Sequence, residues 1–305
     1  MTRWPDFLVA GSPKCGTTAV HSYLRRQRGV FVPLEKEPNY FSRDVRLRKS
    51  KTREEYLALF ERAPSTALVG EVSVWYLYSR EAARAILKSC GKVKIVAMLR
   101  NPVEATAALH AQLVLEGDEP ITDLEAALEA NRNGSRPDIS GWKGRECLDY
   151  ERVYSYSEQL ERFLELFGRE RVHVVLFDDW RRDTRAAYEG LCDFLGIEAS
   201  PGIDYAVVNP HKRVTRPRLR DWSRRSNRGL RALGRVLLPG ERLRQGVRRP
   251  LARVLKSAYT RVEPRAELPE GLRNRLVERF APDVERLSSL TGRDLSHWLE
   301  VAESA

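Results

Sequence analysis

The 305-residue sequence has few cysteines, few histidines and no long apolar run. Its cysteines, Cys15, Cys90, Cys147 and Cys192, are widely spaced and form no CxxC pair. This spacing excludes a zinc cluster or a disulfide scaffold and agrees with a reducing compartment. No stretch approaches the roughly 20 apolar residues that a membrane-spanning helix needs. The N-terminus has no apolar core long enough for a secretory signal, so we expect a cytoplasmic protein.

The charged residues are unevenly distributed. The chain has 53 Lys and Arg against 42 Asp and Glu, which gives a formal charge of +11. Residues 211–262 hold 17 of the basic residues and only two acidic ones, and the remainder of the chain has a small negative charge. At 42% hydrophobic residues, the sequence can form a large core and is not typical of a disordered or fibrous protein.

Short apolar runs alternate with helical patterns along the first 210 residues. The apolar runs, which predict buried strands, are 7–10, 67–69, 93–99 and 172–177. The helical patterns are near 17–27, 53–62, 80–89, 102–116, 151–167 and 184–195. Strands separated by helices predict an open, mostly parallel α/β sheet of four or five strands with helices on both faces. Ligands bind such sheets at the carboxyl ends of the strands.

The pattern changes after residue 210, where basic helical segments begin and a final helix follows near 269–290. We found no internal repeat and no low-complexity linker. The sequence therefore predicts a single domain over residues 1–305, with a core of residues 1–210 and a basic helical extension of residues 211–305.

The loop after the first apolar run is the strongest chemical signal. The run ends at Gly11, and a helix opens around Gly16, which points free backbone N–H groups and a positive helix end at one place. The spacing of the two glycines matches the ATP-binding pattern GxxxxGK[ST], but Thr17 stands where that pattern has lysine. The lysine of this loop, Lys14, precedes the second glycine by two residues. The pattern predicts a phosphate site that differs from that of a magnesium-dependent kinase.

A second anion contact is expected at Arg100, which stands between the run 93–99 and the next helix. Pro102 suits the first turn of that helix, because its missing N–H would have no partner there. The alternative is an arginine that only caps the helix at the surface.

The segment Pro13-Lys14-Cys15-Gly16-Thr17-Thr18 resembles the 5′-phosphosulfate loop of the sulfotransferases that use 3′-phosphoadenosine 5′-phosphosulfate (PAPS). The resemblance extends over nearly the whole chain and is closest to the bacterial members and the carbohydrate and heparan-type enzymes. It implies a P-loop-like fold and transfer of a sulfuryl group to a hydroxyl or an amine. It further implies that no metal is required and that 3′,5′-adenosine bisphosphate is the product left by the donor. The donor contacts implied in the loop are Ser12, Pro13, Lys14, Cys15, Gly16, Thr17 and Thr18.

The resemblance also implies that Arg100 holds the 3′-phosphate of the nucleotide. Similar enzymes add a serine eight residues later, but this chain has Ala108 there, and Thr106 lies on another face of the helix. The alanine in place of serine removes one neutral hydrogen bond, worth about 0.5–1.5 kcal/mol, so we expect the nucleotide to bind more weakly but still to bind. The loop that opens the basic stretch resembles in position the family's other 3′-phosphate loop. Its candidates are Lys212, Arg213 and Arg216.

The segment of residues 34–41, Leu-Glu-Lys-Glu-Pro-Asn-Tyr-Phe, resembles the Lys-Glu-x-x-x-Phe segment of the heparan-type enzymes. Its glutamate takes the proton of the acceptor in those enzymes, which assigns this role to Glu37, while Lys14 supplies the cation at the leaving oxygen. Glu71 and Ser73 follow another strand end, so we expect them to line the acceptor cleft, with Glu71 as the alternative base. The other predicted pocket residues are Lys36, Tyr40 and Phe41.

Three interpretations fit residues 211–262. They bind the highly charged donor, they attract an acidic acceptor or a membrane surface through amphipathic helices, or they are solvated arginines on helices packed against the core. Nucleic acid fits poorly, because aromatic residues are not interleaved with the arginines and no nucleic-acid-binding motif occurs.

Two other functions compete with sulfuryl transfer. The first is an ATP-dependent small-molecule kinase, and the second is a nucleotide-binding protein without catalysis. The sequence leaves the acceptor open among carbohydrate, lipid and secondary-metabolite groups, and it indicates no oligomeric state.

Overall fold

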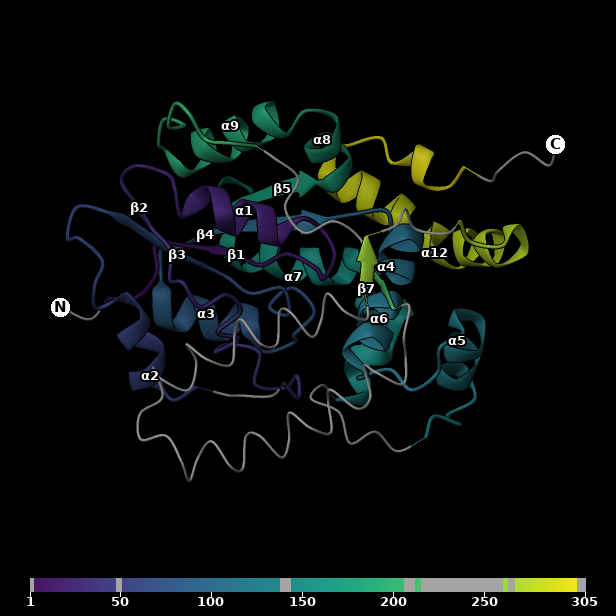
Figure 1. Ribbon diagram of the computed structural model, residues 1–305. Helices are drawn as coiled ribbons and strands as arrows, with labels where there is room; N and C mark the ends of the chain where they lie inside the picture. The colour runs from purple at the N-terminus through teal and green to yellow at the C-terminus, as the bar shows by residue number, and fades with distance from the viewer. Residues whose placement is uncertain are drawn as a thin grey trace, which may run out of the picture. The chain divides into compact units, whose positions relative to one another are not determined.

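The computed structural model describes residues 3–47, 51–137, 144–205, 212–214, 260–262 and 267–300. In this part of the chain, five parallel strands form one sheet in the order β2-β3-β1-β4-β5 (Figure 1). The predicted open parallel sheet is therefore confirmed. The strands are β1 (Phe7–Val9), β2 (Val30–Phe31), β3 (Leu68–Val72), β4 (Lys94–Leu99) and β5 (Val172–Leu176).

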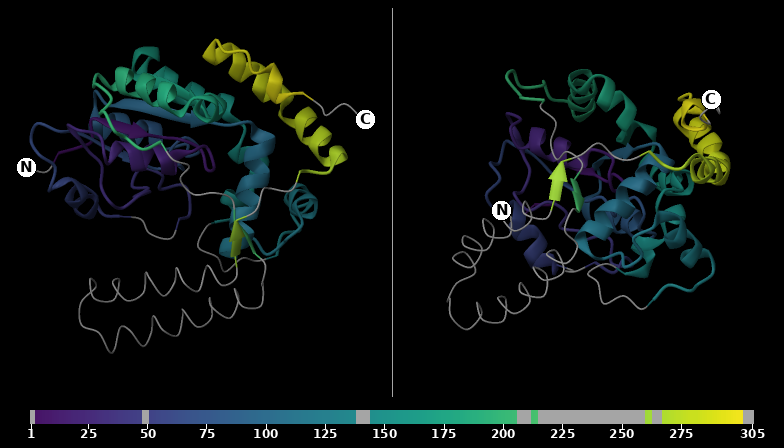
Figure 2. Two further views of the ribbon diagram at one scale, coloured as in Figure 1. Left: turned by 45° about the horizontal axis from the view of Figure 1, so that its top comes forward. Right: turned by 45° about the vertical axis from the view of Figure 1, so that its right-hand side comes forward.

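Helices connect the strands and follow the last one (Figures 1 and 2). The α-helices are α1 (Thr17–Leu24), α2 (Arg53–Leu57), α3 (Ala82–Cys90), α4 (Pro102–Glu116), α5 (Leu124–Arg132), α6 (Tyr150–Val153), α7 (Tyr156–Phe167), α8 (Phe177–Arg182), α9 (Thr184–Leu195) and α12 (Glu270–Thr291). The 3₁₀ turns are η1 (Ala58–Phe60), η2 (Arg145–Leu148), η3 (Arg169–Arg171) and η4 (Ser296–Trp298).

Successive residues of the central strands point to opposite faces of the sheet, and each face has its own apolar core. Leu8 and Ile95 join the core formed with α3, α4, α7 and α12. Phe7 and Val96 join the core formed with α1, α8 and α9. Both faces are thus covered, as the continuous apolar runs of these strands require.

The long helix predicted over residues 151–167 is two helices, α6 and α7, separated at Tyr154 and Ser155. The side chain of Ser155, at the N-cap of α7, forms no capping hydrogen bond. The carboxylate of Asp283 on α12 instead accepts hydrogen bonds from the backbone N–H groups of Tyr156 (2.7 Å) and Ser157 (3.0 Å). A residue more than 120 positions away in the sequence therefore fixes where α7 begins.

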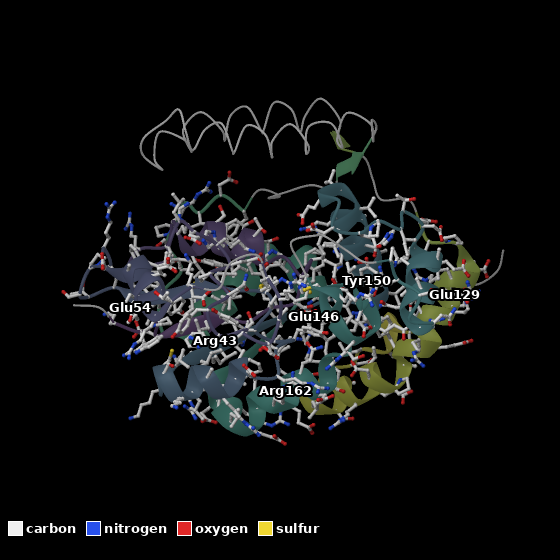
Figure 3. All side chains as sticks on the ribbon, turned by 90° about the horizontal axis from the view of Figure 1, so that it is seen from below. Arg43, Glu54, Glu129, Glu146, Tyr150 and Arg162 are labelled. Carbon is white, nitrogen blue, oxygen red and sulfur yellow. The ribbon has the colours of Figure 1, made fainter. Side chains whose placement is uncertain are left out.

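Helix α7 is also fastened to the segment that follows β3. Arg162, labelled in Figure 3, donates to the backbone carbonyl of Leu77 at 3.2 Å and pairs with Glu158 one turn earlier at 3.1 Å. The contact helps to fix the segment after β3, which carries part of the candidate site.

The chain divides into two compact units. The first contains the sheet and residues 268–305, so α12 belongs with the core, and the second contains residues 115–117 and 209–267. Of the second unit, the structure describes a short antiparallel pair, β6 (Lys212–Val214) and β7 (Thr260–Val262). The predicted basic helices and Arg216 lie outside the described residues.

In the part of the chain that the structure describes, no helix is long and apolar enough to span a membrane.

Replacing Asp283 by alanine should destabilise the protein by about 2 kcal/mol, since it removes charge-assisted hydrogen bonds to the first N–H groups of α7. Urea unfolding monitored by circular dichroism measures the change. Glu285→Ala, an exposed position on the same helix, is the matched control and should stay within about 0.5 kcal/mol of the wild type. Equal stability of the two variants would contradict the capping role.

Candidate functional site

The loop from Ser12 to Gly16 begins as a continuation of the sheet. The backbone N–H of Ser12 donates to the carbonyl of Met98 at 3.0 Å, which extends the ladder between β1 and β4 beyond Val9. Gly11 has no room for a side chain, because a Cβ there would lie 2.7 Å from Cγ2 of Thr17. The loop is therefore tied to the carboxyl edge of β4 and turns sharply onto α1.

The opening of α1 leaves main-chain donors available for an anion. Gly16 is the N-cap, with φ at +87°, and no side chain caps the helix there. The hydroxyl of Ser12 is buried and has no hydrogen-bond partner among the described residues, and Thr18 is half-buried. Backbone N–H groups at a helix start together with an unpaired hydroxyl fit a phosphate or sulfate group.

Lys14 adopts a left-handed backbone conformation with φ at +67°. For a residue with a side chain this conformation costs about 1 kcal/mol or more, and it persists where the surrounding structure compensates for the cost, as it often does at functional sites. Its ammonium donates to Oε1 of Gln112 on α4 at 2.8 Å. Sequence reasoning missed Gln112, which shares no motif with the loop and reaches it through the fold.

The underside of the loop is closed by two tyrosines. Tyr154 donates to the carbonyl of Pro13 at 3.1 Å, and the Cys15 sulfur lies 3.8 Å from the hydroxyl of Tyr156. Burial raises the pKa of the Cys15 thiol to about 12, although its contact with Tyr156 acts in the opposite direction. The side chain of Cys15 thus packs beneath the loop, and only its backbone can face an anion.

Arg100 lies directly beside the loop, at the end of β4. Its Nη1 donates to the carbonyl of Lys14 at 3.2 Å, and its Nη2 pairs with Glu104 at 2.6 Å. Its guanidinium carbon also lies 4.5 Å from the ring centroid of Phe177. The structure therefore brings Arg100 and Lys14 together and adds Glu104 as a neighbour that the sequence did not indicate.

The other positions considered in connection with the 3′-phosphate lie on α4 and in β6. Ala108 is buried on α4, and the hydroxyl of Thr106 is fully buried with no partner among the described residues. Lys212 and Arg213 lie in β6. Their role at a phosphate stays a prediction.

The segment around Glu37 is the second strained element. Glu37 and Asn39 both have positive φ, at +60° and +52°. The backbone N–H of Glu37 donates to the carbonyl of Val72 at 3.0 Å, which attaches the segment to the end of β3. The Glu37 carboxylate pairs with Lys36 at 2.6 Å, and its side chain is 34% exposed. It is therefore accessible to a bound molecule.

Tyr40 and Phe41, predicted as pocket walls, lie in an aromatic cluster of the core. The Tyr40 ring stacks on that of Tyr56 at 4.5 Å, and Phe41 meets the same ring edge-on at 5.4 Å. Phe41 is 2% exposed and Tyr40 is 9% exposed. Both rings anchor the Glu37 segment from below.

Glu71, the alternative base, is 1% exposed and Ser73 is fully buried. The Glu71 carboxylate accepts hydrogen bonds from Ser73 at 2.9 Å and from Tyr56 at 3.3 Å. Burial raises the pKa of Glu71 to about 7, although hydrogen bonds from Tyr76, Ser73 and Tyr56 act against this rise. Compared with Glu37, this carboxyl group is enclosed by hydroxyl groups of the protein.

The fold brings the two strained segments to one edge of the sheet. The loop with Lys14 follows β1, the segment with Glu37 is bonded to the end of β3, and Arg100 follows β4. These strands are neighbours and run parallel, so their carboxyl ends meet at the same edge. Across the described residues, the non-glycine residues with positive φ are Lys14, Glu37 and Asn39.

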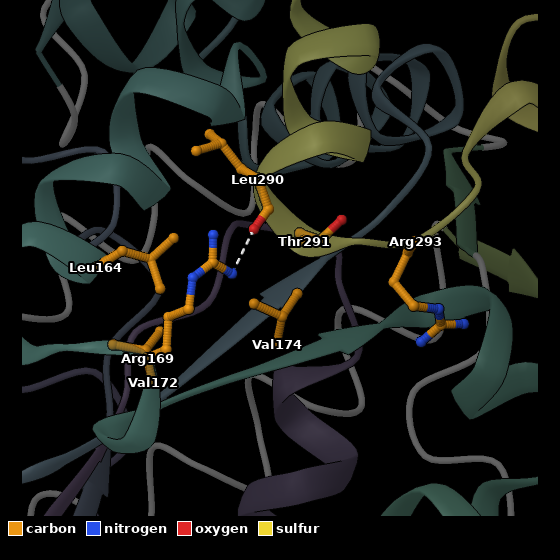
Figure 4. A pocket seen from close by; sticks show the side chains of 7 residues that line it. All are labelled: Leu164, Arg169, Val172, Val174, Leu290, Thr291 and Arg293. Carbon is orange, nitrogen blue, oxygen red and sulfur yellow. Dashed lines mark hydrogen bonds between the residues drawn. The ribbon is translucent and has the colours of Figure 1, made fainter.

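A separate cavity of about 200 Å³ lies beside β5 and contains none of the predicted site residues (Figure 4). Arg169 crosses it and donates to the backbone carbonyl of Leu290 at 2.8 Å.

Among the residues that the structure describes, no three His, Cys, Asp or Glu side chains gather as a metal site requires. The predicted independence from metal stays a prediction.

A family model described as "Sulfotransferase domain" matches residues 4–246. Human heparan sulfate glucosamine 3-O-sulfotransferase 6 is 26% identical over 292 residues, which are 96% of this chain and 73% of that protein. Bifunctional heparan sulfate N-deacetylase/N-sulfotransferase 1 of Caenorhabditis briggsae is 25% identical over 217 residues. This match covers 68% of the present chain but only 24% of that relative.

A solved structure is also similar. The crystal structure of a sulfotransferase from Alicyclobacillus acidocaldarius superposes with a TM-score of 0.71 at 24% identity. The superposition covers 97% of the present chain and 99% of that chain. This likeness confirms the fold.

The raised pKa of Glu71 predicts how stability depends on pH. A carboxyl group with a pKa of about 7 in the folded protein and 4.5 in the unfolded chain favours folding most below pH 4.5. That contribution is lost as the pH rises through 7 and amounts to about 3 kcal/mol. Urea unfolding between pH 5 and pH 8 should therefore show the wild type losing stability relative to Glu71→Gln.

Glu61→Gln, which changes an exposed carboxyl group, is the control and should follow the wild type across this range. Parallel stability profiles for the wild type and Glu71→Gln would show that Glu71 has an ordinary pKa.

Proposed function

Because the chain belongs to the sulfotransferase domain family, we propose that it transfers the sulfuryl group of PAPS to a hydroxyl or an amine of a glycan or small-molecule acceptor. The observation that carries this proposal is the location of the backbone strain. Lys14 and Glu37 are held in left-handed conformations at one edge of the sheet. Strain of this kind concentrates at functional sites, and the transfer needs one cation and one base.

On the donor side, the backbone N–H groups of Gly16, Thr17 and Thr18 bind the 5′-phosphosulfate at the start of α1. The Lys14 ammonium moves from Gln112 to the bridging oxygen and stabilises the charge that forms there. Arg100 binds the 3′-phosphate and exchanges part of its contact with Glu104 for it. Lys212 and Arg213 are the further candidates at this phosphate.

On the acceptor side, Glu37 removes the proton from the attacking hydroxyl or amine. The acceptor atom forms a bond to sulfur while the bond from sulfur to the bridging phosphate oxygen breaks. The electron pair stays on that oxygen, which belongs to 3′,5′-adenosine bisphosphate and is stabilised by Lys14. The transfer is direct and in line, with no covalent enzyme intermediate and no metal, because the lysine supplies the positive charge.

A glycan acceptor is supported by the names of the two curated relatives, which describe sulfation of heparan sulfate at oxygen and at nitrogen. The accessible Glu37 beside Lys36 suits an acceptor that carries negative charge elsewhere. A cytoplasmic location and a membrane contact through residues 211–262 stay predictions.

Donor binding is tested by thermal denaturation with nucleotides. We expect 3′,5′-adenosine bisphosphate to raise the melting temperature by several degrees, corresponding to about 4 kcal/mol at a thousandfold excess over its dissociation constant. ATP with magnesium should have little effect. In Lys14→Ala the rise should be smaller, whereas Lys92→Ala, at an exposed loop lysine, should keep it. Stabilisation by ATP and magnesium alone would instead favour a kinase.

Catalysis is tested by Glu37→Gln in a transfer assay with ³⁵S-labelled PAPS and chemically desulfated heparan polysaccharide as the probe acceptor. We expect kcat to fall about 100-fold or more, with the KM for PAPS unchanged, because the variant loses the proton acceptor and keeps the donor loop.

Glu35→Gln is the matched control, since Glu35 is the adjacent exposed carboxyl group and pairs with Lys51. It should retain kcat within about threefold. If Glu37→Gln is as active as Glu35→Gln, Glu37 is not the base. If neither the wild type nor the variants transfer sulfate while the nucleotide binds, a binding protein without catalysis becomes the better description.

A further inference from the structure

Three hydrogen bonds hold the turn that presents Glu37, and all reach it from the end of β3. The first joins the N–H of Glu37 to the carbonyl of Val72 at 3.0 Å. The second joins the N–H of Asn39 to the hydroxyl of Ser73 at 3.1 Å, and the third joins the N–H of Tyr40 to the hydroxyl of Tyr76 at 3.0 Å. Two consecutive amides of a strained turn therefore depend on side-chain hydroxyls.

Both hydroxyls are themselves bonded to one buried carboxylate. Ser73 donates to Oε2 of Glu71 at 2.9 Å, and Tyr76 also forms a hydrogen bond with this carboxylate. A hydroxyl has one hydrogen, so a hydroxyl that donates to Glu71 presents only lone pairs on its other sides. Those lone pairs are what the N–H groups of Asn39 and Tyr40 require.

We propose that Glu71 is a positioning residue, whose carboxylate orients the hydroxyls of Ser73 and Tyr76 and thereby holds the turn that presents Glu37. The inference deepens the proposed function, because it assumes that Glu37 is the base. It differs from the sequence-based expectation for Glu71 and Ser73, which placed both in contact with the acceptor. A carboxylate that is 1% exposed and accepts from several hydroxyls of the protein acts through its neighbours.

Several titratable groups face Glu71, and their pKa values decide which of them change charge near neutral pH. They come from three elements besides its own strand: Tyr56 on α2, Cys90 at the end of α3, and Glu37 on the turn. Burial raises the pKa of Cys90 to about 12 and that of Tyr56 and Tyr76 well above 10, so these groups stay neutral. Among these neighbours, Glu71 is therefore the group whose charge changes near neutral pH.

Protonation of Glu71 would weaken the arrangement. A neutral carboxyl group carries a hydrogen of its own and becomes a donor as well as an acceptor. It no longer attracts the hydroxyl hydrogens of Ser73 and Tyr76 equally, so the bonds to the two backbone amides lose their fixed direction. Burial makes the neutral form of Glu71 the more stable one for the fold as a whole, but the hydrogen bonds of the turn itself should be held most firmly when Glu71 is ionised.

Two tyrosines provide a matched pair for the test. Tyr56 and Tyr76 are both buried and both donate to Glu71, but only Tyr76 also accepts from the turn. Replacing either by phenylalanine removes one hydroxyl and preserves the ring. An effect that comes only from removing a hydrogen bond to Glu71 should appear in both variants. Weaker protection of the turn from hydrogen exchange should appear only in Tyr76→Phe.

The readout is hydrogen exchange of the full chain, followed by mass spectrometry on peptides that cover residues 37–41. We expect exchange of this segment, corrected for intrinsic rates, to be at least tenfold faster in Glu71→Gln and in Tyr76→Phe than in the wild type. Tyr56→Phe should stay within about twofold. In the wild type, protection should fall as the pH drops below 7, and Glu71→Gln should lack this dependence.

The transfer assay gives the second readout. Glu71→Gln and Tyr76→Phe should lower kcat about tenfold with the KM for PAPS unchanged, whereas Tyr56→Phe should keep kcat within about threefold. Wild-type protection in Glu71→Gln, or equal exchange in the two tyrosine variants, would overturn the proposal. Exchange does not depend on sulfuryl transfer, so a wild type that transfers no sulfate would count against the proposed function and leave this test decisive.

Discussion

The hydrogen-bond ladder between β1 and its two parallel neighbours is the constraint on which the site depends. It continues beyond the strands, through Ser12 to Met98 on one side and Ser73 to Val9 on the other. The loop with Lys14, the segment after β3 and Arg100 are therefore fixed by the same backbone frame. Short loops after the strands therefore place side chains that are distant in sequence at one edge of the sheet. The N-terminus of α1 lies at this edge, and its positive dipole end attracts an anion.

Strain and burial are combined at this edge. Lys14 and Glu37 occupy backbone conformations that residues with side chains avoid, and the surrounding bonds compensate for the cost. For Lys14 these bonds come from Arg100 and Tyr154, through the carbonyls of the loop. The segment around Glu37 is held from the side of the core by hydroxyl groups and aromatic rings. The two candidate segments are thus rigid for different reasons: the loop is held by the guanidinium of Arg100 and the phenol of Tyr154, and the segment around Glu37 is held through the buried carboxyl group of Glu71.

The sequence predicted much of the fold, since continuous apolar runs and regular helical spacing are local signals. It also indicated that Arg100 and the loop with Lys14 each follow a strand, and the ends of neighbouring parallel strands meet at one edge. It could not predict what tertiary contacts decide. The start of α7 depends on Asp283, the Lys14 ammonium is held by Gln112, and β2 is too short to leave a pattern. Tyr40 and Phe41 follow Glu37 directly, yet their rings turn into the core, which no motif reveals.

Cys15 stands in the middle of the loop assigned to the donor, but its sulfur is turned away beneath it. With a pKa of about 12, only roughly one thiol in 100,000 is ionised at neutral pH, and the thiolate is the form that reacts. The loop should consequently resist peroxide and alkylating reagents. A thiol at the centre of the candidate donor loop therefore need not make that loop sensitive to oxidative inactivation.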